Sequence, residues 1–352
     1  RKRTSVKWTM YDPDVLPLWV AEMDAMPPRS VVEAVSRAMV EGNTGYPSPQ
    51  PTYAESFARV AARRWGWTVD VAATSIASDT INAIRYLVTH LAPPGGGVVI
   101  PSPVYPPFFM VVEEAGRTVV PAAMTAEHRL DAEAIDRALA ESGATVVLLC
   151  SPHNPTGTVH TADELAAVAA VAEARGAHVV VDEIHALLVP EGTQFTPYLS
   201  LTERGFVVTS ASKAYNLAGL KAGIIVAGAE SAELVTALPE SVHYGASLIG
   251  CIAHEAAWDG GDAWIDAVNA NIRSNVAFLG DLLTDRLPGA RLVVPQSTYL
   301  AWIDCRDLGL GDDPAAVFLD KGRVALNSGP TFGLGGTAHA RINLACSRAT
   351  LT

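Results

Sequence analysis

Short apolar runs separated by helix-like stretches fill the chain from about residue 41 to residue 235. Residues 98–100, 145–150 and 224–226 are mostly hydrophobic. Such continuous runs are typical of strands buried on both faces of a parallel sheet. An alanine-rich stretch at 162–175 follows one of them and predicts a helix. The alternation therefore predicts an α/β fold, a mainly parallel sheet with helices on both faces.

The pattern changes after residue 260, where apolar residues recur every three or four positions and predict one long helix with a single apolar stripe. The stripe consists of Trp264, Val268, Ile272, Val276, Leu279 and Leu283. Beyond the Pro-Gly pair at 288–289, expected strands at 299–304 and 340–344 flank a helix start at the Asp-Pro pair 313–314. This order predicts a small α+β domain after the long helix.

We therefore expect three parts in the chain. Residues 1–40 form an N-terminal arm that joins the small domain, with a helix starting after the Pro-Pro pair at 27–28, because proline suits a first helical turn. Residues 41–284 form the large domain, including the long helix, and residues 285–352 form the C-terminal small domain. A chain of 352 residues that is 49% hydrophobic can bury roughly 75% of its unfolded surface.

Charge and cysteine usage narrow the class of protein. The net charge is −12 and the isoelectric point is about 5.2, which argues against a nucleic-acid or anionic-membrane surface. We expect no membrane span, because no segment has about 20 uninterrupted apolar residues, and no signal peptide. The four cysteines lie far apart without metal or redox spacing. We expect no metal site, and buried free thiols in a cytoplasmic setting.

Three polar residues follow apolar runs directly. Asn154 comes after the run at 145–150, Asp182 ends the run at 178–181, and Lys213 follows the run at 205–209. Carboxylates are rarely buried without a partner, so Asp182 is unexpected for packing alone. Open α/β sheets bind ligands at the carboxyl ends of their strands. The three residues therefore predict a binding site at that edge of the sheet.

Lys213 lies where an aldehyde cofactor could be bound covalently. A lysine amine is nucleophilic at neutral pH when it is partly desolvated and near another cation, which Lys221 would supply. The hydroxyls of Ser210 and Ser212 could bind a phosphate group of the cofactor. Taken alone, the segment fits a surface lysine in a polar loop equally well.

These segments resemble a known family. Asn-Pro-Thr-Gly at 154–157, Asp-Glu-Ile-His at 182–185 and the lysine segment at 210–221 resemble the class I/II aminotransferase-like enzymes of fold type I, which use pyridoxal 5′-phosphate (PLP). The resemblance runs nearly end to end. It implies a large domain of mainly parallel sheet and a small α+β domain. It also implies a last helix beyond residue 352, and the sequence starts without methionine, so we expect a chain trimmed at both ends.

A narrower resemblance concerns the arm and the small domain. The sequences at 6–8, 16–24, 45–47 and 297–304, of which the last is Ser-Thr-Tyr-Leu-Ala-Trp-Ile-Asp, are similar to the cystathionine β-lyase, or carbon–sulfur lyase, branch. This branch would act on a small amino-acid substrate.

The resemblance implies a role for each residue around the cofactor ring. Lys213 would be the catalytic lysine, and Asp182 would pair with the pyridine nitrogen and keep it protonated. Asn154 would hydrogen-bond the phenolic oxygen, and His185 lies where many relatives carry a tyrosine that reaches the same oxygen. Tyr105 would stack on the ring. Each residue also has a structural alternative: Asp182 could cap a loop, Asn154 could form a turn, His185 could be a packed histidine, and Tyr105 could be a core aromatic.

At the phosphate end, the resemblance implies contacts from Ser210, Ser212 and Lys221. The amides of Thr80 and Ile81, at the start of an expected helix, would join them, since helix N-termini bind anions.

The remaining implied residues reach the site from other parts of the chain. The family usually has glycine near Asp79, whose charge would repel a phosphate unless the side chain turned away. Tyr46 would reach the phosphate of the neighbouring subunit, which implies a homodimer. Arg341 would bind the substrate α-carboxylate, with backbone at Val20 and Ala21 on its other side; the alternative for Arg341 is a structural salt bridge.

The implied reaction is β-elimination on cystathionine or another S-substituted cysteine, giving a thiol, pyruvate and ammonia, with Lys213 as general base. An aminotransferase uses the same residues, so the motifs shared by both do not separate the two activities. A third alternative is a PLP-binding regulatory protein without turnover, which the acidic charge and the lack of a DNA-binding segment disfavour.

Overall fold

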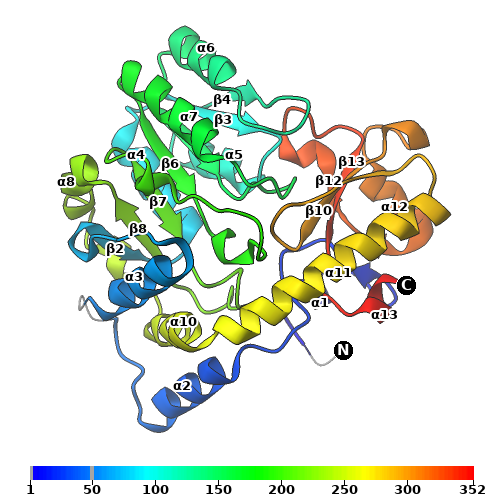
Figure 1. The fold of residues 1–352 in the computed structure, drawn as a ribbon, viewed down its shortest axis with the longest axis horizontal. Helices are drawn as coiled ribbons and strands as arrows, with labels where there is room; N and C mark the ends of the chain where they lie inside the picture. The colour runs from blue at the N-terminus through cyan, green and yellow to red at the C-terminus, as the bar shows by residue number, and fades with distance from the viewer. Residues whose placement is uncertain (1–2, 48–50) are drawn as a thin grey trace.

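The computed structural model describes residues 3–47 and 51–352, and its large domain is built on a seven-stranded sheet (Figure 1). The strand order is β2-β8-β7-β6-β5-β3-β4. The bounds are β2 (Thr74–Ala77), β3 (Gly97–Ser102), β4 (Thr118–Ala123), β5 (Val146–Cys150), β6 (His178–Asp182), β7 (Phe206–Thr209) and β8 (Gly223–Ala227). Neighbours from β4 to β7 pair in parallel, and β8 is antiparallel to both of its neighbours. The expected mainly parallel sheet is confirmed.

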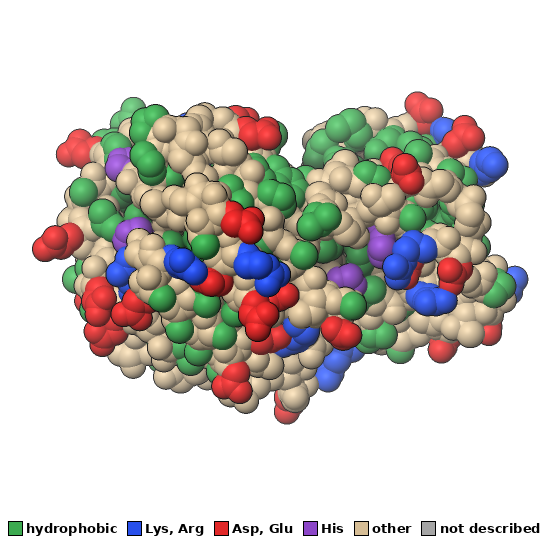
Figure 2. Space-filling model, turned by 90° about the horizontal axis from the view of Figure 1, so that it is seen from above, with side chains coloured by type: hydrophobic (Ala, Val, Ile, Leu, Met, Phe, Trp, Pro, Cys, Tyr) green, Lys and Arg blue, Asp and Glu red, His purple; other side chains and the backbone are tan. Residues whose placement is uncertain are grey.

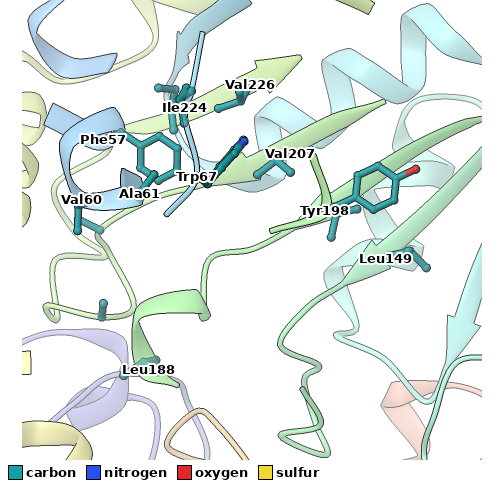
Figure 3. Close-up of a cluster of buried hydrophobic side chains, with 14 of the residues drawn as sticks. Phe57, Val60, Ala61, Trp67, Leu149, Leu188, Tyr198, Val207, Ile224 and Val226 are labelled. Atoms are coloured by element: carbon teal, nitrogen blue, oxygen red, sulfur yellow. The ribbon is translucent and has the colours of Figure 1, made fainter. Parts of the chain in front are cut away.

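Alternate residues of the central strands pack into two separate cores, one on each face of the sheet. In β5, Val147 and Leu149 belong to one core, whereas Val146 and Leu148 belong to the other. The first core also contains residues of α3 (Thr52–Trp65), α6 (Ala132–Ser142) and α7 (Ala162–Ala174), and the second contains residues of α4 (Thr80–Leu91) and α5 (Pro107–Glu114). Figure 3 shows part of the first core, where Phe57 lies beside Ile224. Helices on both faces explain why these strands are hydrophobic throughout.

The small domain holds a four-stranded antiparallel sheet in the order β12-β13-β10-β9. Its strands are β9 (Arg291–Val293), β10 (Leu300–Asp304), β12 (Asn327–Ser328) and β13 (His339–Asn343). The helix α12 (Pro314–Gly322) packs against β11 (Val324–Ala325), β12 and β13, and a short α13 (Arg348–Leu351) follows. Seen from above, the surface is notched between the large domain on the left and this domain on the right (Figure 2).

The long helix α11 (Asp262–Arg286) runs diagonally between the two domains (Figure 1). Ile265 and Ile272 belong to a core of the large domain, whereas Leu279 and Leu283 belong to the core of the small domain. One continuous apolar stripe thus serves both cores.

The N-terminal arm contacts both domains. It contains α1 (Val6–Thr9) and β1 (Leu16–Pro17), and β1 pairs in parallel with β11 of the small domain. The next helix, α2 (Arg29–Val40), packs against α10 (Leu248–Gly260) of the large domain. The division at residues 40 and 284 stays a prediction. The remaining helices are α8 (Ala232–Thr236) and α9 (Ser241–Tyr244).

Within the described ranges, no helix is long and apolar enough to cross a membrane. The four cysteines are free and buried. Across residues 3–47 and 51–352, no cluster of three or more His, Cys, Asp or Glu side chains is arranged to hold a metal ion.

Candidate active site

Three adjacent parallel strands bring the predicted polar residues to one edge of the large sheet. Cys150 at the end of β5 lies beside Asp182 at the end of β6, and Asp182 lies beside Val208 near the end of β7. Asn154, Asp182 and Lys213 consequently line one cavity of about 310 Å³. Ten of the predicted residues line this cavity: Ala21, Thr80, Ile81, Tyr105, Asn154, Asp182, His185, Ser212, Lys213 and Lys221.

Lys213 combines a lowered basicity with a defined hydrogen bond. Its Nζ donates to the carbonyl oxygen of Ala21 at 3.3 Å. Burial, followed by the positive charge of Arg341, lowers the pKa of Lys213 to about 8. A substantial share of its amines is therefore neutral, and hence nucleophilic and basic, near physiological pH.

Asp182 is a buried carboxylate that forms no ion pair within residues 3–47 and 51–352. Burial raises its pKa to about 7, against the opposing effects of the Ile184 amide, which donates to Oδ1 at 3.0 Å, and of Lys213. No lysine or arginine of the described chain forms an ion pair with it. Because an unpaired buried carboxylate is costly, this position favours a ligand that brings a positive charge.

His185 is buried and neutral beside the same cavity. Burial, with the nearby charges of Lys213 and Arg341, lowers its pKa to about 3. No residue of the described ranges bonds its Nδ1, and its ring lies edge-on to Tyr299 with centroids 6.3 Å apart. A neutral imidazole here can exchange a hydrogen bond with a bound group but does not carry a charge.

Arg341 is a buried cation whose hydrogen-bond partners, among the residues that the structure describes, are neutral groups. One of its terminal nitrogens donates to Oδ1 of Asn154 at 3.0 Å and the other to the carbonyl of Trp19 at 2.9 Å. Nε has no partner among the described residues, and burial lowers the pKa of the guanidinium to about 10. No carboxylate in the described ranges pairs with Arg341, so the structural salt bridge considered from the sequence is absent there. A buried guanidinium without an anion suits a substrate carboxylate.

Thr80, Ile81, Ser212 and Lys221, which the resemblance assigns to the phosphate, also line the cavity. Thr80 and Ile81 open α4, so their amides have no partner inside the helix. Ser210 does not line the cavity. Its hydroxyl donates to the carbonyl of Ala222 at 2.8 Å and accepts from the Ser212 amide at 3.1 Å. Ser210 therefore fixes the loop that carries Ser212 and Lys213.

Tyr46, Val20 and Arg341 also lie outside the cavity lining. The Tyr46 side chain is 83% exposed, and its ring meets that of Tyr244 with centroids 6.3 Å apart. It does not line the cavity of its own chain. The carbonyl of Val20 accepts a hydrogen bond from Asn343 at 2.7 Å, so Val20 acts here through its backbone.

Sequence reasoning missed the way in which the segment from Trp19 to Ala25 is held. We call this segment the strap. Every carbonyl oxygen along it accepts a side-chain hydrogen bond. The pairs are Arg341 to Trp19, Asn343 to Val20, Lys213 and Tyr299 to Ala21, Lys7 and Asn343 to Glu22, Arg3 and Asn216 to Met23, Arg3 to Asp24, and Asn216 to Ala25. The strap thus connects the lysine loop of the large domain with strand β13 of the small domain.

Tyr299 and Asn216 are the most informative of the missed residues. The Tyr299 hydroxyl donates to the same Ala21 carbonyl as Lys213, at 3.2 Å. Asn216 adopts a left-handed conformation with φ of 59°, and its amide group bonds Met23 and Ala25. The signal was present in the quoted motifs, because Asn216 lies three residues after Lys213 and Tyr299 opens the apolar run at 299–304.

Gly157 explains the form of the Asn-Pro-Thr-Gly loop. Its φ is +71°, and a Cβ there would lie 2.3 Å from Pro295 Cβ and 2.7 Å from the Ser297 carbonyl oxygen. Its own carbonyl accepts from the amides of Gln296 and Ser297, both at 3.0 Å. Only glycine allows this close contact between the loop and the small domain.

The chain matches the family Aminotransferase class I and II over residues 13–352. The chain belongs to this family. It is 45% identical over 377 residues to a proposed cystathionine β-lyase of Mycobacterium tuberculosis, with 99% of this chain and 92% of the relative covered. It is 33% identical to the cystathionine β-lyase of Corynebacterium glutamicum, covering 100% of this chain and 95% of that relative.

Solved structures agree with the fold. A proposed PLP-dependent β-cystathionase from Corynebacterium diphtheriae superimposes with a TM-score of 0.93 at 33% identity, covering 99% of this chain and 92% of that one. Cystalysin from Treponema denticola, whose structure contains PLP, superimposes with a TM-score of 0.92 at 25% identity, covering 99% and 92%. The fold type I architecture expected from the sequence is confirmed.

The residues of the cavity fit PLP. Asp182 is a desolvated carboxylate that forms no ion pair in the described part of the chain, which suits a protonated pyridine nitrogen. Lys213 supplies a partly neutral amine for the aldehyde, and Tyr105 contributes an aromatic ring to the lining. Lys221 and the amides of Thr80 and Ile81, which open α4, would bind the PLP phosphate.

Proposed function

We propose that this protein is a PLP-dependent carbon–sulfur β-lyase that acts on cystathionine or another S-substituted L-cysteine and releases a thiol, pyruvate and ammonia. The observation that carries the proposal is that Lys213 lines the cavity while the buried Arg341, which has no anionic partner among the described residues, bonds Asn154 of the same cavity lining. End-to-end similarity to proteins named cystathionine β-lyase supports the lyase reaction.

PLP would be held by Lys213 at its aldehyde, Asp182 at its ring nitrogen, and Tyr105 against its ring, with Ser212 and Lys221 near its phosphate. When bound, PLP supplies an electron sink for the negative charge that develops at the substrate Cα. Asp182 would favour this function, because its carboxylate would stabilise the protonated form of the ring nitrogen.

Arg341 orients the substrate. Its guanidinium can bind the α-carboxylate through two parallel hydrogen bonds, and its contacts to Asn154 and Trp19 keep it in place. Because Asn154 also lines the cavity, one asparagine touches both the arginine and the space available to the cofactor.

Lys213 carries the proton transfers. The amine of Lys213, when it is not bonded to the cofactor, would accept the Cα proton as general base, because burial and the charge of Arg341 lower its pKa from the usual lysine value. The Ala21 carbonyl at 3.3 Å is an acceptor for the resulting ammonium. A thiolate is a good leaving group at Cβ, so no metal acid is required for its departure.

The active unit that we propose is a homodimer in which Tyr46 reaches the phosphate end of the partner's cavity. The exposure of Tyr46 and its absence from the lining of its own cavity support this arrangement. A cytoplasmic location is part of the proposal, supported by four free, buried cysteines.

The test is pyruvate release from L-cystathionine without any keto-acid acceptor. A lyase forms pyruvate over many turnovers, and the Lys213→Ala variant forms none above background. An aminotransferase stops after one turnover, with the aminated cofactor absorbing in the near ultraviolet. That result, or a protein that binds PLP and changes no tested amino acid, would refute the lyase proposal.

A further inference from the structure

Asp79 occupies the phosphate end of the cavity in an unexpected way. It immediately precedes α4, and its Oδ1 accepts from the Asn82 amide at 2.8 Å as the helix N-cap. Its Oδ2 accepts from Nζ of Lys221 at 3.1 Å. One carboxylate therefore engages both an amide of the helix N-terminus and the neighbouring ammonium.

Those two groups are the ones that an anionic ligand would use. Asp79, Thr80, Ile81, Asn82, Ser212 and Lys221 all line the cavity that also contains Lys213 and Asp182. The sequence alone left open whether Asp79 turns away from this region, and the structure shows that it does not. Gly223 packs directly behind it, since a Cβ at Gly223 would lie 3.3 Å from the Asp79 Cα.

The carboxylate keeps its charge. Burial alone would raise the pKa of Asp79, but the hydrogen bonds from Asn82 and Lys221 outweigh it and lower the pKa below its usual value. A phosphate monoester carries about −1.5 to −2 charges at neutral pH. Phosphate and Asp79 would thus compete for Lys221 and repel one another.

We propose that Asp79 sets the affinity of this protein for its cofactor, by holding Lys221 and the start of α4 and so weakening the binding of the PLP phosphate. The inference rests on the proposed PLP site and concerns how firmly the cofactor is retained. The Lys221 side chain is 58% exposed and that of Asp79 is 25% exposed, so water screens the repulsion and the expected effect is about tenfold in the dissociation constant.

The decisive variant is Asp79→Asn, which keeps a capping oxygen for α4 and removes the charge. Full-length protein saturated with PLP is diluted in steps, and the loss of cofactor absorbance gives the dissociation constant. We expect Asp79→Asn to hold PLP about tenfold more tightly than the wild type. With pyridoxal, which lacks the phosphate, the two proteins should bind equally.

A matched control is Asp131→Asn. Asp131 caps α6 through the Ala134 amide at 2.9 Å, so this variant makes the same chemical change outside the cavity, and its PLP affinity should equal that of the wild type. If Asp79→Asn fails to fold, Asp79→Ser, which also keeps a cap, takes its place. This variant should likewise hold PLP about tenfold more tightly than the wild type.

Unchanged or weaker PLP binding in both Asp79 variants, or an equal gain with pyridoxal, would overturn the proposal. These measurements contain no amino-acid substrate. Failure to release pyruvate would therefore refute the lyase reaction and leave the role of Asp79 standing, whereas a chain that binds no PLP would refute both.

Discussion

Asp182 shows how a functional residue lowers the stability of the protein that carries it. Its carboxylate is buried, and its pKa is raised to about 7 in the folded chain from 3.8. Between these two values the folded state binds more protons than the unfolded state, so folding stability falls as pH rises through this window. Above about pH 7 the carboxyl of Asp182 is ionised in both the folded and the unfolded state, so its effect on folding stability no longer changes with pH.

The Asp182→Asn variant should reveal that cost. Without PLP, its free energy of unfolding should increase relative to the wild type as pH rises from about 4 to about 7, because the variant has no carboxylate to ionise there. Urea unfolding at pH 5 and pH 8 measures the difference. The same variant should lose PLP-dependent activity. A stability difference that does not depend on pH would contradict the buried, unpaired carboxylate.

Arg341→Lys tests the carboxylate site. Lysine keeps the charge but loses the planar fork, so it cannot bind a carboxylate through two parallel bonds. We expect KM for the amino acid to rise about 10- to 100-fold, while the visible spectrum of bound PLP stays unchanged. A KM equal to that of the wild type would show that Arg341 does not bind the substrate.

At the scale of elements, the strap depends on a few buried amides. Asn343 is fully buried, donates to the carbonyls of Val20 and Glu22, and accepts from the Ala345 amide. Strand β13 thereby holds both Arg341 and the backbone beside Lys213.

Asn343→Ala should destabilise the protein by about 2 to 4 kcal/mol, because it leaves these buried backbone groups unpaired. The midpoint of urea unfolding measures the loss. Asn43→Ala, at an exposed position, is the control and should change stability by less than about 0.5 kcal/mol. Equal effects of the two substitutions would mean that the strap is not held through Asn343.

The elements that could be predicted from the sequence were those with continuous or periodic apolar patterns. The strands that carry Asn154, Asp182 and Lys213 were predicted because strands buried on both faces are hydrophobic throughout. The reversed direction of β8 was not predicted, since a central antiparallel strand gives the same apolar run. The contacts of the strap were not predicted either, because carbonyl acceptors leave no side-chain pattern in the sequence.

Individual side chains were harder to place than strands. The sequence places Ser210 beside a phosphate, yet its hydroxyl bonds the carbonyl of Ala222, a choice that depends on loop geometry. In contrast, the position of Lys213 followed from the strand before it. Local spacing fixes which residues reach the site, and tertiary contacts fix what each hydroxyl or amide does there.

At the scale of the whole molecule, the proposed dimer predicts complementation between two inactive variants. Tyr46→Ala subunits keep Lys213, and Lys213→Ala subunits keep Tyr46. If Tyr46 serves the partner's cavity, a mixed dimer contains one complete site. An equal mixture, unfolded and refolded together, should recover about a quarter of the wild-type pyruvate release. Recovery no greater than that of the separate variants would place Tyr46 in its own site or outside the chemistry.

The strap has a consequence for the order in which the molecule is made. Its backbone lies near the start of the chain, but the side chains that bond it include Lys213, 192 positions later, and Asn343, 323 positions later. A growing chain on the ribosome therefore cannot complete the surroundings of the lysine until strand β13 has emerged. We expect partly synthesised chains to be unable to retain PLP, the active form of vitamin B6.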